Sequence, residues 1–559
     1  MLVTVSAAHM SDHRRPHTAK IVIPHCPSGE IVANNEYANG IIRYDFGSNM
    51  MSDRSESMFD HFLIYGFRNA RDKAPSVLYH FPTGENTMIK QKYDISLDTL
   101  GSFCFPRHVL EDDSDEAYQS VLDDSISAAR KVMDSTFIFT LNVTCPEDEI
   151  PVEYRDKEKH ENLPPPTIVK YGFCVMTKEP EGMCPSVSQE WRTSRRVGAD
   201  DLVSGRVNLT RRCYCIISSN PAFAVLYQFM DAFITRERLA IKYSAGLVAK
   251  DIVSPRDETI KMMEEFYNHH VPKPNKGKCF LLKCDPRKEW FSFSKTTKDG
   301  LVAEWCFPPT FKIVNTKSLM KMLGYLMMDA PLIVSTLSSG VASAVIFTFL
   351  VLLRPLAWCG TVSTVMPSTQ SGAMYMAPVP FISYSHKSIP DLVGKVRSDA
   401  ILLNLDSTPI RCRIPKQTYG FEFDMPYTKK LMAVLSSMQT QFKEHLYIKE
   451  VTAVMDSFRR FQCKLLYKIL RGITPLQLDT YLNATKDLAN IWYNSKPKRS
   501  NKDKKLLFIK RYVVSQTFTT FLMEFGAVLL RIMYHSNMKD LKSFEDCFKP
   551  MKKKLFPKL

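Results

Sequence analysis

The longest uncharged stretch of the chain, Ala330–Leu353, constrains the fold more than any other feature. Its 24 residues are enough for one helix across a bilayer. Within the stretch, however, Leu332–Thr336 is rich in β-branched residues, which favour a strand. The serines that follow, Ser338 and Ser339, are both suited to cap a helix.

The remaining apolar segment, Val341–Leu353, is too short for a membrane span. At a rise of 1.5 Å per residue it reaches about 20 Å, against a hydrocarbon core of about 30 Å. Pro355 follows it and ends the helix. We therefore expect a buried strand, a turn and a core helix, with a single-span membrane protein as the alternative.

The chain is basic, with 74 lysines and arginines against 58 acidic residues and a net charge of +16. The surplus gathers in Lys496–Lys505 and Lys549–Leu559. These segments are either a solvated loop and tail or a tether to an anionic membrane surface. The candidate tether residues are Lys496, Lys498, Arg499, Lys552, Lys553 and Lys554. No motif for nucleic-acid binding accompanies the charge, so that partner is not expected.

The fourteen cysteines include no CxxC pair, and the nearest spacing is Cys213-x-Cys215. No export signal precedes them, so we expect a cytoplasmic protein with reduced cysteines buried as small apolar side chains. The pair His269–His270 has no cysteine or carboxylate at ligand spacing. The sequence therefore predicts no metal site and no cofactor.

The first half of the chain has the pattern of an antiparallel sheet. Short apolar, β-branched and aromatic runs bounded by Gly and Pro indicate strands. They occur at His61–Gly66, Ala74–Gly84, Leu100–His108, Ser135–Thr144, Thr167–Thr177 and Arg211–Ser219. The intervening segments 146–166 and 178–210 have the composition of loop insertions. A helix follows over Asn220–Ala240, with Asn220 as N-cap and Pro221 at its first position.

The second half predicts helices packed on further strands. Thr316–Asp329 places Leu319, Leu323, Leu326 and Met327 on one helical face. A Lys-, Pro- and Gly-containing segment at 269–279 marks a boundary between two lobes.

The order of these motifs resembles the DENN-domain family. The resemblance runs from about Phe59 to Met523 and rests on a series of short strings. In order they are FLIYGF, VLYHFP, FCFP, FIFT, YGFC, CYCIIS, LMMDAPLIVST, RPLAW, MAPVPFI, SDAILLNLDST and QTFTTFLMEF. Each string is degenerate, and their order and spacing carry the resemblance. Three positions depart from the family pattern: Ala330 after Asp329, Arg354 before Pro355, and Ser383 in place of Gly.

The resemblance implies an α/β fold with two lobes, an N-terminal longin-like module with an antiparallel sheet and a C-terminal α/β DENN module ending in helices. The implied division is a flexible arm (1–40), an upstream module (41–243), a linker (244–300), a central module (301–396), a downstream module (397–530) and a basic tail (531–559).

The resemblance also implies a guanine-nucleotide exchange factor that promotes GDP release from a Rab-family small GTPase in membrane trafficking. Such a protein acts in the cytoplasm, with peripheral association with endomembranes as an option. Exchange requires differential binding of two GTPase states and no nucleophile of the protein's own. This agrees with a sequence that contains no GxxxxGK[ST], GxSxG or HExxH motif and predicts no small-molecule substrate.

Two loops are the candidates for contacting the GTPase. The loop Gly66–Lys73 offers Arg68 and Arg71 to acidic groups, and Ala377–Ser385 offers Phe381 and Tyr384 as aromatic contact area. The alternatives are an exposed polar turn and a core-packing motif, respectively. A non-catalytic scaffold, or a GTPase-activating component with Arg68, Arg71 or Arg107 as an arginine finger, is the alternative function.

Overall fold

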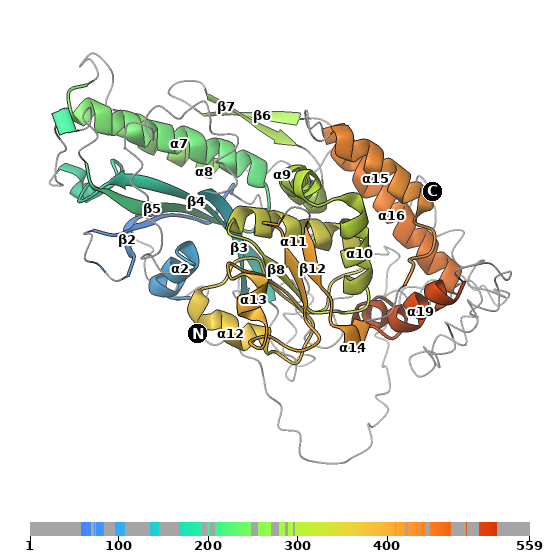
Figure 1. Cartoon of the computed structure of the whole chain (residues 1–559). Helices are drawn as coiled ribbons and strands as arrows, with labels where there is room; N and C mark the ends of the chain where they lie inside the picture. Colours follow the sequence, from blue (N-terminus) through green and yellow to red (C-terminus); the bar gives the residue numbers. More distant parts are fainter. Residues whose placement is uncertain are drawn as a thin grey trace, which may run out of the picture.

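The fold is described from a computed structural model of the chain. It describes residues 57–68, 72, 74–82, 95–106, 135–144, 167–192, 198, 200–201, 207–247, 255–269, 279–284, 289–294, 297–407, 410–419, 423–441, 448–470, 488 and 502–522. Within these residues the protein is a mixed α/β structure with two five-stranded sheets (Figure 1).

The N-terminal sheet is antiparallel, with strand order β2-β1-β5-β4-β3. Its strands are β1 (His61–Gly66), β2 (Ser76–Phe81), β3 (Thr136–Thr144), β4 (Thr167–Pro180) and β5 (Leu209–Ser218). Five of the six predicted strands are thus confirmed. Strand β1, which lies between β2 and β5, is buried along its whole length, as its continuous apolar run predicts.

The predicted strand at Leu100–His108 is wrong, because Leu97–Cys104 forms helix α2. Ser96 caps this helix by accepting a hydrogen bond from the backbone N–H of Thr99 at 3.1 Å. A short apolar run of this kind fits either a strand or a helix. Here the Ser96 cap and the burial of Leu100 and Cys104 on one side of α2 favour the helix.

Helices α7 (Phe223–Ser244) and α8 (Pro255–Asn268) pack together beside the N-terminal sheet, and α7 runs along the sheet in Figure 1. Their shared contact includes Phe229 stacked on Phe266, with ring centroids 4.2 Å apart. The predicted helix is confirmed, but it begins at Phe223 after Ala222, which supplies no side-chain cap. Asn220 instead donates its backbone N–H to the hydroxyl of Ser218.

The segment 244–300 contains regular structure where a linker was predicted. Besides α8 it includes the hairpin β6 (Cys279–Cys284) and β7 (Glu289–Ser294) and the start of α9 (Lys298–Ile313).

The second sheet has the order β12-β11-β8-β10-β9, and its four strands β9, β10, β8 and β11 are parallel. The strands are β8 (Leu332–Ser335), β9 (Thr361–Ser363), β10 (Phe381–Ser385), β11 (Ile401–Asn404) and the antiparallel β12 (Arg411–Arg413). Helices α10 (Thr316–Leu326), α11 (Ser339–Leu353), α12 (Ser368–Tyr375) and α13 (Ile389–Leu392) connect or flank them.

The uncharged stretch folds as predicted into β8, a turn and α11, with Ser338 capping the helix through Val341 N–H at 3.2 Å. No helix in the described ranges has the length and apolar character needed to cross a membrane. Arg354, which follows α11, pairs with the buried Asp299 of α9 at 3.4 Å. This departure from the family pattern therefore has a local charge partner.

Aromatic side chains of α9 and α11 join the two sheets into one continuous hydrophobic cluster. Phe347 of α11 lies 5.7 Å from Phe223 and 6.2 Å from Tyr171, measured between ring centroids. Trp305 of α9 lies 5.6 Å from Phe173 and 5.4 Å from Tyr227 in the same way. The two sheets therefore share a core, and the expected separation into two lobes is not evident in this packing.

The C-terminal part of the described chain is helical: α14 (Lys416–Tyr419), α15 (Lys429–Gln441), α16 (Ile448–Leu470), α19 (Lys502–Tyr512) and residues 516–522. The last segment falls within the string QTFTTFLMEF, which the DENN resemblance implies to be a helix, as far as the structure describes it. Asp329, before β8, accepts hydrogen bonds from Gln516 N–H, Thr517 N–H and the Thr517 hydroxyl and so anchors this helix.

Candidate functional site

The carboxyl ends of β8, β10 and β11 meet at one edge of the second sheet because these strands are parallel. Open α/β sheets place their binding surfaces at this edge. We call residues 335–338, 385–388 and 404–407, which end and follow the three strands, the carboxyl-edge surface. Polar side chains predominate in it: Ser335, Thr336, Ser338, Ser385, His386, Lys387, Ser388, Asn404, Asp406 and Ser407.

Asp406 holds the first segment of this surface in place. Its carboxylate accepts a hydrogen bond from the Thr336 hydroxyl at 2.6 Å and another from the Leu337 N–H at 2.8 Å. The Thr336 hydroxyl in turn accepts from the Ser338 N–H at 3.2 Å. The turn between β8 and α11 is therefore fixed by side-chain hydrogen bonds from a neighbouring strand.

Leu337 projects from this fixed turn, and 66% of its surface is exposed. The exposed residues Asp406 and Lys387 belong to the same carboxyl-edge surface, and the backbone oxygen of Lys387 accepts from the Ser335 hydroxyl at 2.7 Å. A single exposed leucine is ordinary in proteins. A leucine whose backbone is held by a carboxylate, in a surface that also contains an exposed lysine, has the composition of a binding surface.

Arg68, predicted to contact a GTPase, lies directly after β1 with its side chain 55% exposed. Its guanidinium is 3.6 Å from the equally exposed carboxylate of Glu190 in helix η2 (Gln189–Arg192). Exposed pairs of this kind contribute at most about 1 kcal/mol, so Arg68 can exchange this partner for another. Arg71 and Arg107 lie outside the described residues, as do Lys496, Lys498, Arg499, Lys552, Lys553 and Lys554.

Phe381 and Tyr384 lie in β10 and are 0% and 4% exposed. They point to opposite faces of the strand. Phe381 belongs to a cluster with Ile333, Tyr375 and Leu402, whereas Tyr384 belongs to the main core. Their burial supports the core-packing alternative for this motif, and contact with a GTPase stays a prediction for both.

Arg68 lies at the end of the N-terminal sheet that is remote from α11. The strand register places Arg212 opposite Gly66 and Thr177, whereas Tyr171 contacts α11 at the other end of β4. Thr177 lies six residue steps along β4 from Tyr171, which is roughly 20 Å. The structure therefore does not bring Arg68 together with Phe381 and Tyr384.

The part of the insertion that follows β4 is held against the body of the protein by buried charges. The Glu237 carboxylate accepts from the Ser186 N–H at 2.9 Å and from the Ser186 hydroxyl. Arg212 donates to the Met183 carbonyl at 2.6 Å, and Arg256 donates to the Ser186 carbonyl at 2.8 Å. Burial raises the pKa of Glu237, although the hydrogen bonds from Ser186 and the charge of Arg212 oppose this shift. These contacts position η2, and hence Glu190, beside Arg68.

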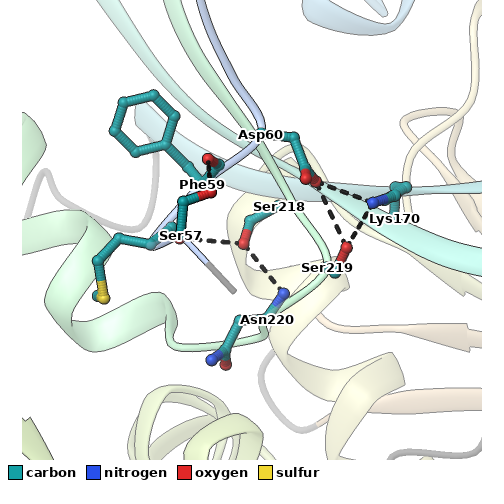
Figure 2. Close-up of polar contacts among 8 residues, drawn as sticks. Ser57, Phe59, Asp60, Lys170, Ser218, Ser219 and Asn220 are labelled. Carbon is teal, nitrogen blue, oxygen red and sulfur yellow. Dashed lines mark hydrogen bonds and ion pairs between the residues drawn. The ribbon is translucent and has the colours of Figure 1, made fainter. Parts of the chain in front are cut away.

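A polar network fixes the other end of the N-terminal sheet (Figure 2). The buried Lys170 of β4 pairs with Asp60 at 3.0 Å and also donates to the Ser219 hydroxyl. Ser219 in turn contacts Asp60 at 3.4 Å, which closes the triangle. The lysine charge is therefore compensated inside the protein, and the network links β1, β4 and β5 as a structural joint.

The side chains best suited to hold a metal are thiols. Within the described ranges, Sγ atoms of Cys104, Cys174 and Cys213 all lie within 4.8 Å of one another, and all three are fully buried. Burial alone raises a thiol pKa, but hydrogen bonds from Cys104 and Cys174 lower the pKa of Cys213 to about 7. No local spacing in the sequence indicates this cluster, because its members are far apart in the chain: Cys104 and Cys174 are separated by 70 residues.

Fold and site together define a mixed α/β protein with a fixed polar edge suited to binding. Residues 209–408 match the DENN (AEX-3) domain family, from the start of β5 to the end of the carboxyl-edge surface. The match confirms the resemblance of this chain to DENN-domain proteins. No curated protein matches the chain.

Proposed function

We propose that the chain is a guanine-nucleotide exchange factor that promotes GDP release from a Rab-family small GTPase in membrane trafficking. DENN domains are generally associated with this activity, and the match at 209–408 supports it. The observation that carries the proposal is the exposed, hydrogen-bonded Leu337 at the carboxyl-edge surface inside the matched region.

The mechanism is differential binding. A surface that binds the nucleotide-free GTPase more tightly than the GDP-bound form shifts the equilibrium toward release. Leu337 supplies apolar contact, while Asp406 and Lys387 supply charge of both signs that selects the orientation of the partner. Because Asp406 already fixes the Leu337 backbone, little ordering cost remains when the partner binds.

The first test is release of fluorescent GDP from a panel of purified Rab GTPases, with the full chain at catalytic concentration. Acceleration on one or a few members is expected. Leu337→Ala should reduce the rate about tenfold, as expected for an interface anchor worth about 1.4 kcal/mol. Leu247→Ala is the matched control, because Leu247 is also exposed and lies after α7.

Three outcomes separate the alternatives. If both variants accelerate GDP release from the GTPase as much as the unmodified chain does, the carboxyl-edge surface is not the binding surface. Stable binding of a Rab without release would favour the scaffold. Neither release nor binding on any member would contradict the proposal.

A GTPase-activating role is the second candidate, because Arg68 is exposed and its partner Glu190 is exposed as well. An arginine finger contributes about 10³-fold or more to GTP hydrolysis. Arg68→Ala should abolish stimulated hydrolysis in that case, while Arg411→Ala, which removes an exposed arginine of β12, should leave it unchanged.

A further inference from the structure

Four fully buried cysteines gather on one face of the N-terminal sheet, outside the carboxyl-edge surface. They are Cys104 of α2, Cys174 of β4, and Cys213 and Cys215 of β5, each 0% exposed. Three separate elements thus contribute thiols to one place in the core.

The strand register explains why the thiols converge. Cys174 lies directly opposite Cys215 in the β4–β5 pair, so their side chains point to the same face. Cys213 precedes Cys215 by two residues and points to that face as well. Helix α2 ends there with Cys104, whose Sγ lies 4.0 Å from the Sγ of Cys174.

The separations match those of sulfur ligands around one metal ion. With metal–sulfur bonds of about 2.3 Å, two sulfurs are about 3.8 Å apart in a tetrahedral site and about 4.0 Å apart in a trigonal one. The sulfurs of Cys104, Cys174 and Cys213 lie within 4.8 Å of one another, so shifts of less than about 1 Å complete either geometry.

We propose that Cys104, Cys174 and Cys213 bind a thiophilic metal ion, Zn²⁺ or Cu⁺, with Cys215 as the fourth ligand in a tetrahedral zinc site. An all-sulfur donor set selects these soft ions over Mg²⁺ and Ca²⁺, which prefer oxygen. Each binding thiol loses its proton to solvent, and the ion then links α2, β4 and β5. The function of this site is structural, because the cluster is buried away from the carboxyl-edge surface.

The test is metal analysis of the full chain, purified with a phosphine reductant after growth with added zinc and copper. We expect about one zinc or copper per chain, and the element found decides between the two ions. Cys174→Ser and Cys213→Ser should each lower the content at least about fivefold. Cys306→Ser is the matched control, since Cys306 is also fully buried but lies in α9.

Two results would overturn the proposal. One is metal-free protein whose melting temperature does not rise after refolding with Zn²⁺ or Cu⁺, which leaves the thiols as ordinary apolar packing. The other is equal metal content in the unmodified chain and in Cys174→Ser, which places the ion elsewhere.

If the serine variants fail to fold, X-ray absorption at the metal edge of the unmodified protein still decides the question. Three or four sulfurs at about 2.3 Å would support the site. A shell dominated by nitrogen or oxygen would contradict it.

Discussion

The two large sheets contain the same number of strands but differ in strand direction and strand length. The N-terminal sheet has antiparallel strands of up to 14 residues, and its buried Lys170 is compensated by Asp60, which directly precedes β1. The second sheet has strands of 3 to 5 residues whose parallel carboxyl ends leave Leu337 and Asp406 exposed. We therefore infer that the first sheet serves as a scaffold, whereas the edge of the second sheet is the part that would offer groups to a partner.

The sharpest test of this comparison concerns Phe347, which joins the two sheets. Phe347→Ala should lower the free energy of unfolding by about 3–5 kcal/mol, because it removes a fully buried ring from their shared core. Amide exchange should accelerate in both β5 and β10. Acceleration confined to β10 would mean that the two sheets unfold independently. Val514→Ala, a control at an exposed position, should leave the amide-exchange rates of both β5 and β10 unchanged.

The next effect concerns the compensated charge in the N-terminal sheet. Asp60→Ala leaves the buried Lys170 without its carboxylate and should cost about 3 kcal/mol in urea unfolding. The double variant with Lys170→Met should recover part of this loss, since it removes the uncompensated charge. Glu190→Ala breaks the exposed pair with Arg68 and should cost less than about 1 kcal/mol. Equal losses of unfolding free energy in Asp60→Ala and Glu190→Ala would mean that the buried pair and the exposed pair contribute alike, which would contradict the comparison.

A smaller effect is expected where the second sheet anchors the C-terminal helix. Asp329→Ala removes the acceptor for Gln516 and Thr517 and should destabilise the protein by about 1–2 kcal/mol. Thermal unfolding is the measurement. Asp391→Ala, which removes an exposed contact to Ser388, should change stability by no more than about 0.5 kcal/mol.

The smallest effect is a pH dependence from Glu237. Its folded-state pKa is raised from the ordinary 4.5 by burial, so its protonated form is favoured in the folded protein. The stability that this group contributes is therefore greatest below pH 4.5 and falls as the pH rises through the folded-state pKa. The difference in unfolding free energy between the unmodified chain and Glu237→Gln should increase in favour of the unmodified chain on acidification. A difference that is constant with pH, or of opposite sign, would contradict this assignment.

Local sequence pattern determined much of the fold. The apolar run at His61–Gly66 predicted β1, and Ser338 with the uncharged residues after it predicted α11, because caps and apolar length act over a few neighbouring residues. The order of motifs also resembles the DENN family, and residues 209–408 match the model of that family. The strand predicted at Leu100–His108 failed because short apolar runs fit both strand and helix until their packing partners are known.

Only the tertiary structure decided which residues meet. The residue type of Phe381 and Tyr384 predicts contact residues, and the packing of apolar clusters on the two faces of β10 buries both side chains. No local pattern singles out Leu337, because the carboxylate that holds its backbone belongs to Asp406, 69 residues away in the chain. Cys104 and Cys174 are separated by 70 residues and are brought to 4.0 Å by the packing of α2 on the sheet. Elements form from neighbours in sequence, whereas sites form from contacts across sheets, which no local pattern specifies.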